Sequence, residues 1–195
     1  TIEEDIYFHG RRQINLIIPI DRDYAVSPFV ADLMADEGLV APRGQFVVLR
    51  INGRLQGLYY EVEQFDKPLM AAYDRPETTI FGQNGRAQHF EQYTSLGTGV
   101  ASDARFDMGS VRETVDPAYD LGMPLVALLN AHERQPSPAT FRRARAALDW
   151  DKYLAFRAVT TLLNTNHVRF GSDNLKLYFD ASRGLLEPVP WDAHL

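Results

Sequence analysis

Hydrophobic positions follow a strand pattern at two places in the first part of the chain. "RRQINLIIPI" (11–20) contains a long apolar run, which predicts a strand. The stretch "QFVVLRINGRLQGLYYEVEQ" (45–64) has two runs rich in β-branched and aromatic residues on either side of Asn52-Gly53. Asn-Gly between two such runs is the strongest short signal for a β-hairpin, so we expect this dipeptide at the tip of a hairpin.

The pattern changes to a helical spacing in the segments that precede and follow this hairpin. "DRDYAVSPFVADLMADEG" (21–38) predicts a helix with Ser27 as its N-cap, Pro28 in its first position and Gly38 at its end. Phe29, Leu33 and Met34 would share its apolar face. After the hairpin, "DKPLMAAY" (66–73) predicts a short helix.

The second half of the chain alternates between an irregular stretch, helices and a final hairpin. Periodicity fades over 75–118, where we expect an insertion with short elements. Helices are predicted at 123–134, at 137–149 with Ser137 as cap and Pro138 first inside, and at 149–164. A polar loop then leads to two strands, "NLKLYF" and "LLEPVP", joined by a turn at "DASRG". Strands early and late with helices between them predict an α+β fold.

Composition excludes several classes of function. The 195 residues carry a net charge of −6, so we expect no nucleic-acid partner. The absence of cysteine excludes disulfides and thiol chemistry. No run of 18 apolar residues occurs, so no membrane span is predicted. The chain opens "TIEEDIYF", without methionine or a signal-peptide pattern, and we expect it to be a fragment of a longer protein.

Chemistry is most strongly indicated near the end of the chain, around Trp191-Asp192. A hairpin brings the loop before its first strand close to the end of its second strand, so Asp192 should lie near Asn166, His167 and Asn174. A carboxylate and an amide oxygen suit Mg²⁺, which prefers hard oxygen ligands and leaves positions for nucleotide phosphates. Protein kinases use such an Asn and Asp pair. The alternative is that both residues merely form turns.

Two other interpretations of polar residues remain open. His167 and His194 together with Asp192 form a possible transition-metal site, since two histidines and a carboxylate suffice for zinc or iron. The arginines at 142, 143 and 145 lie on one predicted helix, where they form either a solvated face or a contact for an anionic partner.

Four segments in order resemble the spore-coat CotH kinase family, a family of atypical kinases with a protein-kinase-like fold. The tail matches through Tyr153-Leu154, Asn164-Thr165-Asn166, a strand from Asn174 to Tyr178, and Pro190-Trp191-Asp192. The N-terminal half matches through "INLIIPIDRDYAVSPFVADLMADEGLVAP" and through the hairpin pattern I-N-G-x-x-x-G-x-Y-x-x-x-E. The resemblance covers residues 11–73 and 149–195 and leaves the middle unmatched.

The resemblance implies a role for several individual residues. Asp192 and Asn174 fall on the metal-binding aspartate and asparagine of the family. Glu63 falls on the glutamate of the hairpin, which in a kinase-like lobe would hold a phosphate-contacting base; the alternative is an ordinary surface residue of an alternating strand. The resemblance also implies ATP and Mg²⁺ as cofactors. It further implies one kinase-like domain with three parts: a strand and hairpin lobe (1–73), an irregular insertion (75–118) and a helical part with the metal-site hairpin (119–195).

The chain departs from the family pattern at three points. The catalytic aspartate falls on Asn166, and an amide cannot accept a hydroxyl proton as a carboxylate does. The second acid after Trp-Asp is replaced by His194. No lysine lies in the early strand, where Arg11 and Arg12 would have to hold phosphate. Asp173, directly before Asn174, is a candidate for the missing carboxylate.

These observations support three hypotheses about function. The first is an ATP- and Mg²⁺-dependent kinase that phosphorylates a surface or coat protein, whose identity the sequence does not give. The second is a catalytically inactive kinase-like module with a structural role, which Asn166 favours. The third is a histidine-dependent metal hydrolase. The family resemblance favours an extracellular, cell-envelope or spore-surface location.

Overall fold

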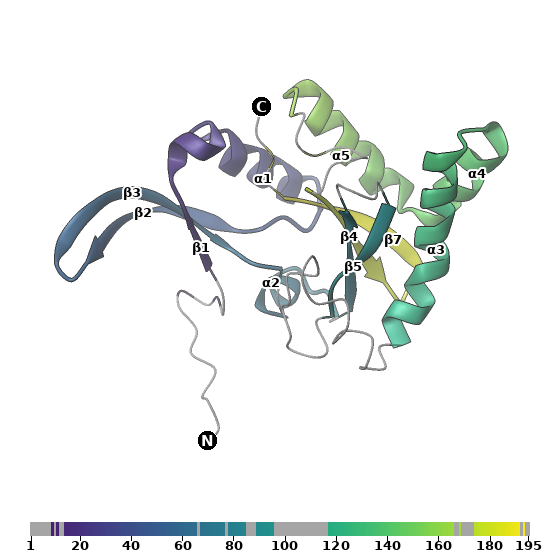
Figure 1. The fold of residues 1–195 in the computed structure, drawn as a ribbon, viewed down its shortest axis with the longest axis horizontal. Coiled ribbons are helices and arrows are strands. Elements are labelled where there is room, and N and C mark those ends of the chain that lie inside the picture. Colours follow the sequence, from purple (N-terminus) through teal and green to yellow (C-terminus); the bar gives the residue numbers. More distant parts are fainter. Residues whose placement is uncertain are drawn as a thin grey trace, which may run out of the picture.

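The fold is α+β, with two small antiparallel sheets and several helices, as the sequence predicts (Figure 1). The computed structural model describes residues 9, 11, 14–65, 67–76, 78–84, 89–95, 117–165, 168, 174–191 and 193. The elements in chain order are β1 (Ile14–Ile17), η1 (Pro19–Arg22), α1 (Val26–Asp36), β2 (Gly44–Ile51), β3 (Arg54–Glu63), α2 (Lys67–Ala72), β4 (Thr79–Asn84), β5 (His89–Ser95), α3 (Pro117–Arg134), α4 (Pro138–Ala147), α5 (Trp150–Leu162), β6 (Leu175–Asp180) and β7 (Leu185–Pro190).

The first sheet has the order β1-β3-β2, and its longest part is the β2–β3 hairpin. Asn52 and Gly53 form the tip with φ angles of 51° and 77°, the left-handed pair that a two-residue turn of this type requires, which confirms the predicted hairpin. Figure 1 shows the hairpin extending away from the rest of the molecule. Its register shifts at Leu49/Arg50, where the β3 strand contains one extra residue before Gly57.

The second sheet has the order β5-β4-β6-β7 and forms the centre of the molecule. β6 and β7 are the predicted final hairpin, with Leu175 opposite Pro190. β4 and β5 lie within 75–118, where hydrophobic periodicity fades, and β4 is an inner strand that pairs with β6 through Ile80 and Tyr178. Part of this irregular stretch therefore supplies the buried core.

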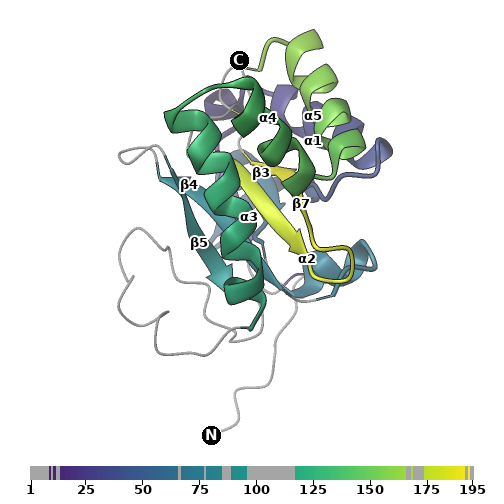
Figure 2. The same cartoon turned by 90° about the vertical axis from the view of Figure 1, so that its right-hand side faces the viewer.

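Opposite faces of the second sheet pack against different elements. Phe81, Phe179 and Leu186 lie on the face that packs against α1, α3, α4 and α5. Ile80 and Tyr178 lie on the other face, with residues of α2 and of the segment after β3. Figure 2 shows α3 and α4 in front of the sheet, with α5 and α1 beside α4 at the upper right. Both faces are thus covered, which explains why every residue of β6 is buried.

The helix termini agree with the sequence in α4 and differ from it at the start of α1. Ser137 accepts a hydrogen bond from the Thr140 N–H at 3.1 Å and the Thr140 hydroxyl accepts one from the Ser137 N–H, so the predicted cap is confirmed as a capping box. The prediction that Ser27 caps α1 is wrong, because α1 begins at Val26 and Ser27 lies inside its first turn. Gly38 does end this helix, with a φ of 75°.

The apolar face predicted for α1 is only partly correct. Met34 is buried, as is Val30, but Phe29 is 54% exposed and lies on the outer side. In α5, Phe156 and Thr160 are buried and Val159 packs against the same core. Within the described residues, no helix is both long enough and apolar enough to cross a bilayer.

Candidate functional site

Glu63, at the end of β3, forms a buried ion pair with Arg43. Its side chain has no exposed surface, whereas the side chain of Arg43 is 41% exposed. Arg43 Nε donates to Glu63 Oε1 at 2.7 Å and a second guanidinium nitrogen donates to Oε2 at 2.8 Å. The backbone N–H of Arg43 also donates to Oε1, at 2.7 Å. Glu63 is therefore not a surface strand residue; it holds a guanidinium in one orientation by a bidentate contact.

A second arginine–glutamate pair lies two residues earlier on the same face of β3. Arg11 pairs with Glu61, which also contacts His9 at 3.3 Å and Gln45 at 3.5 Å. The side chain of Arg11 is only 11% exposed. The side chain of Arg43 is therefore more exposed than that of Arg11, the residue that the sequence predicts to contact phosphate. Arg12, the other predicted phosphate contact, lies outside the described residues.

Two tyrosines near these pairs remain protonated at neutral pH. Burial, together with smaller contributions from the carboxylates of Asp32 and Glu63, raises the pKa of Tyr60 to about 12, while Arg11 acts in the opposite direction. Burial also raises the pKa of Tyr73, whose hydroxyl donates to the Ala41 carbonyl at 2.8 Å. Both phenols are therefore neutral, and neither supplies a base at this end of the sheet.

The ends of β3 and β7 meet through aromatic contacts. The rings of Phe65 and Trp191 lie 5.2 Å apart at 62°. Tyr60 and Val62 of β3 also share a small hollow of about 30 Å³ with Trp191. Glu63 is two residues from Phe65 in the chain, so its ion pair lies at the end of β3 that approaches Trp191.

Asn174 lies at this same end of the β6–β7 hairpin. Because Leu175 is opposite Pro190, Asn174 is adjacent to Trp191 across the ladder. Asp192 itself lies outside the described residues, as do Asn166 and Asp173, so the convergence of these side chains stays a prediction. His167 and His194, the residues of the alternative transition-metal site, lie outside them too. The described residues contain no group of three histidine, aspartate or glutamate side chains placed to hold a metal.

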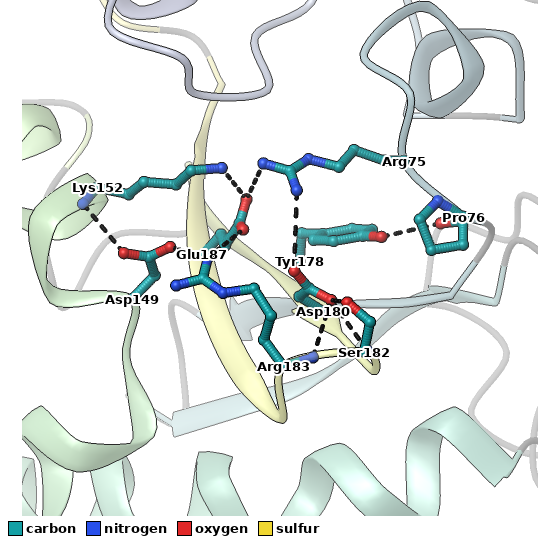
Figure 3. Close-up of polar contacts among 9 residues, drawn as sticks. All are labelled: Arg75, Pro76, Asp149, Lys152, Tyr178, Asp180, Ser182, Arg183 and Glu187. Carbon is teal, nitrogen blue, oxygen red and sulfur yellow. Dashed lines mark hydrogen bonds and ion pairs between the residues drawn. The ribbon is translucent and has the colours of Figure 1, made fainter.

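A larger charged network occupies the opposite end of the β6–β7 hairpin (Figure 3). Glu187 of β7 is at its centre and is 1% exposed. It contacts Lys152 at 2.6 Å, Arg75 at 3.1 Å and Arg183 at 3.5 Å. The other carboxylates of the network are Asp149, which pairs with Arg183, and Asp180, which lies 3.8 Å from Arg75. Three cations and three carboxylates thus balance one another.

The sequence pointed to Glu63 as a residue that would hold a base, but it predicted neither its partner Arg43 nor the Glu187 network. One signal for the network was present, because Glu187 is a charged residue in the otherwise apolar strand "LLEPVP". A charged residue in such a strand indicates a buried pair, although it does not identify the partners. Arg43 directly follows the "G-x-x-A-P" segment, but its pairing with Glu63 depends on the register shift of the hairpin.

A protein-family profile and a known protein both match this chain. The family profile described as "CotH kinase protein" matches residues 2–195. The chain is similar to the inner spore coat protein H of Bacillus subtilis (strain 168), with 24% identity over 187 residues. That alignment covers 95% of this chain and 50% of the relative, so the chain spans half the length of that protein.

Proposed function

This chain belongs to the CotH kinase family, and from that premise we propose that it is a kinase-like domain that binds ATP with Mg²⁺ and phosphorylates a protein. The observation that carries the proposal is the buried Glu63 holding Arg43 bidentately. The relative is named as an inner spore coat protein, so we place the function at the spore coat or another surface layer. The unidentified acceptor is a protein of that layer.

Arg43 is the phosphate-contacting cation of this proposal. Protein kinases hold a lysine for the ATP phosphates by an ion pair with a glutamate. Here the family glutamate is Glu63, and the cation that it holds is an arginine whose side chain is 41% exposed. A guanidinium is planar, always charged and well suited to phosphate oxygens, and 41% of the Arg43 side chain is exposed to solvent. In this proposal Arg43 takes the place of the lysine that the early strand lacks.

Asn174 and Asp192 are the proposed metal ligands. Their amide and carboxylate oxygens are the hard donors that Mg²⁺ prefers, and Asn174 lies beside Trp191, the residue before Asp192. Bound Mg²⁺ would neutralise phosphate charge and orient the nucleotide. The residues of the chain would hold the nucleotide from two sides, with Arg43 on the β3 side and the metal ligands at the β6–β7 end.

The acceptor hydroxyl needs a carboxylate that Asn166 does not provide. We assign this role to Asp173, next to the metal ligand Asn174 in sequence. The side chain would orient the hydroxyl and accept its proton as the phosphoryl group is transferred. If position 166 were instead the base position, the chain would lack a base and would act as an inactive kinase-like module.

Nucleotide binding tests the proposal first. We expect Arg43→Gln to weaken Mg-ATP binding by about tenfold or more, because a charge-assisted bidentate contact is lost. Arg54→Gln, in the exposed hairpin tip of the same sheet, is the matched control and should bind as the wild type does. Isothermal titration calorimetry with and without MgCl₂ measures both. Equal affinity of wild type and Arg43→Gln, in folded protein, would exclude Arg43 from the site.

Transfer of radiolabelled phosphate from ATP to a generic protein acceptor separates the two base assignments. If Asp173 is the base, Asp173→Asn abolishes transfer and Asn166→Asp changes little. If position 166 is the base position, Asn166→Asp raises transfer by about 10²–10⁴-fold, the usual contribution of a positioned general base. Absence of nucleotide binding and of transfer in all these proteins would favour the structural module.

A further inference from the structure

A hollow of about 230 Å³ lies between α3, α4 and the start of α5, apart from the proposed nucleotide site. It opens beside Trp150, the first residue of α5, whereas the loop that leads to Asn174 follows the other end of this helix. Thirteen residues of helix correspond to roughly 20 Å. Leu148, which lines the hollow, pairs with Leu186, and Asn174 lies beside Trp191 about five residues, or roughly 16 Å, further along β7, so a ligand in this hollow would not contact Asn174.

The walls of the hollow are mainly aromatic. Phe141, Trp150 and Tyr153 line it. The rings of Phe141 and Trp150 lie 5.8 Å apart at 83°, and those of Trp150 and Tyr153 lie 5.2 Å apart at 30°. An apolar cavity of about 150 Å³ is enough to bind benzene, so this volume suits a flat ligand somewhat larger than a single ring. Edge and face contacts with three aromatic rings favour a planar aromatic group.

The cation Arg145 lies at the rim of the hollow. The guanidinium of Arg145 is 5.0 Å from the centre of the Trp150 ring. Over the described ranges, from residue 9 to residue 193 with their gaps, no carboxylate lies within ion-pair distance of Arg145. The sequence of α4 carries Arg142 and Arg143 as well and no acidic residue, although the whole chain has a net charge of −6. The charge at this rim is thus locally positive.

The α3 side of the hollow has a different character. His132 and Glu133 line it, and His132 Nδ1 lies 3.0 Å from the Thr140 hydroxyl, which fixes the ring. Glu133 on this side is an acidic residue, whereas Arg145 on α4 is a cation. A negatively charged ligand would consequently direct its charge toward Arg145 on α4.

We propose that this hollow is a binding site for a small planar aromatic anion, with its ring against Phe141, Trp150 and Tyr153 and its carboxylate or phosphate on Arg145. The site goes beyond the proposed phosphoryl transfer and does not depend on it. Aromatic walls supply most of the contact area, and Arg145 supplies selectivity for a negative charge.

Fluorescence of Trp150 tests the proposal directly. The chain has two tryptophans, so Trp191→Phe leaves Trp150 as the reporter. Naphthalene-2-carboxylate should quench its emission saturably and should bind about tenfold more tightly than naphthalene-2-carboxamide, because only the carboxylate forms a charge-assisted contact. Calorimetric titration of the unmodified 195-residue chain with the same two compounds gives an independent measurement.

Two arginine variants on α4 test whether Arg145 causes the preference for a negatively charged ligand. Arg145→Gln should remove the preference for the carboxylate over the amide, and Arg143→Gln should keep it. Both positions are exposed, so both variants should stay folded, and Arg145→Gln should lose only the weak stabilisation from its contact with Trp150. The proposal is overturned if the carboxylate does not bind saturably, if the preference survives in Arg145→Gln, or if Arg143→Gln loses it equally.

Discussion

Glu63 and Glu187 are both buried strand glutamates, yet they are paired in different ways. Glu63 holds one arginine, Arg43, whose side chain is 41% exposed. Glu187 lies among three cations and is joined through them to two more carboxylates. The first arrangement is a single bidentate pair, whereas the second balances three cations against three carboxylates. The exposure of the cation does not separate the two, since Arg183 of the network is 47% exposed; the number of charged partners does.

The largest expected effect comes from breaking the Glu187 network. Glu187→Ala should lower the free energy of unfolding by about 3–5 kcal/mol, because loss of one partner leaves buried cations without compensation. Urea unfolding followed by circular dichroism measures this change. Asp151→Asn, at an exposed position of α5, is the control and should change stability little. A loss below about 1 kcal/mol for Glu187→Ala would mean that the network is as weak as surface ion pairs.

The Arg43–Glu63 pair should behave differently when both charges are removed. We expect the double variant Arg43→Met, Glu63→Leu to lose Mg-ATP binding while its free energy of unfolding stays within about 1–2 kcal/mol of the wild type. Replacing both members of a buried pair by apolar residues of similar size is often neutral or stabilising. Calorimetry and urea unfolding of one preparation give both quantities. Retained ATP binding would contradict the proposed role of the pair.

The pH dependence of stability should report on Asp180. Burial alone raises the pKa of Asp180, but hydrogen bonds from the Ser182 hydroxyl and N–H, from the Arg183 N–H, and the charge of Arg75 outweigh it. The folded pKa therefore lies below the ordinary value of 3.8. A depressed carboxyl pKa stabilises the fold above the unfolded value, and this stabilisation is lost as pH falls through the folded value.

We therefore expect the wild type to lose stability below about pH 4 more steeply than Asp180→Asn does. Urea midpoints at pH 7, 5, 4 and 3 measure the two slopes, and at pH 7 the variant should be the less stable protein. Parallel curves for the two proteins would show that Asp180 does not contribute to the acid sensitivity.

The smallest effect is expected at the most exposed cation of the network. The side chain of Arg183 is 47% exposed, against 18% for Lys152. Arg183→Gln should therefore cost less than about 1 kcal/mol, as exposed ion pairs usually do. Lys152→Met should cost more, because it leaves Glu187 buried without its 2.6 Å partner. Urea unfolding ranks the two, and the reverse order would contradict the link between exposure and contribution.

The sequence predicted the turns and helix ends that depend on residues close together in the chain. Asn52-Gly53, the Ser137 cap and Gly38 each act within a few residues, and each lies where the sequence indicates. The Ser27 cap failed because Pro28 is tolerated throughout the first turn of a helix, so the true start lies earlier, at Val26. Strand β4 gave no clear pattern because both of its faces are covered in the folded sheet.

The site was harder to predict because its contacts cross between elements. Counting outward from the Asn52-Gly53 turn pairs Arg43 with Val62, on the opposite face of β3. The register shift at Leu49/Arg50 moves the pairing by one residue and brings Arg43 opposite Glu63. The partners of Glu187 come from the segment after α2, from α5 and from the β6–β7 turn, and only the tertiary fold brings them together.

The pairing of β4 with β6 has a consequence for how the protein folds during synthesis. Ile80 and Tyr178 are opposite each other, although roughly 100 residues separate them along the chain. Closing so long a loop is slow, and β4 can complete its ladder only after β6 has left the ribosome. Until then one edge of the β4–β5 hairpin is unpaired and can pair with strands of other chains. We therefore expect chaperones to bind the nascent chain most often after β5 has emerged from the ribosome and before β6 has.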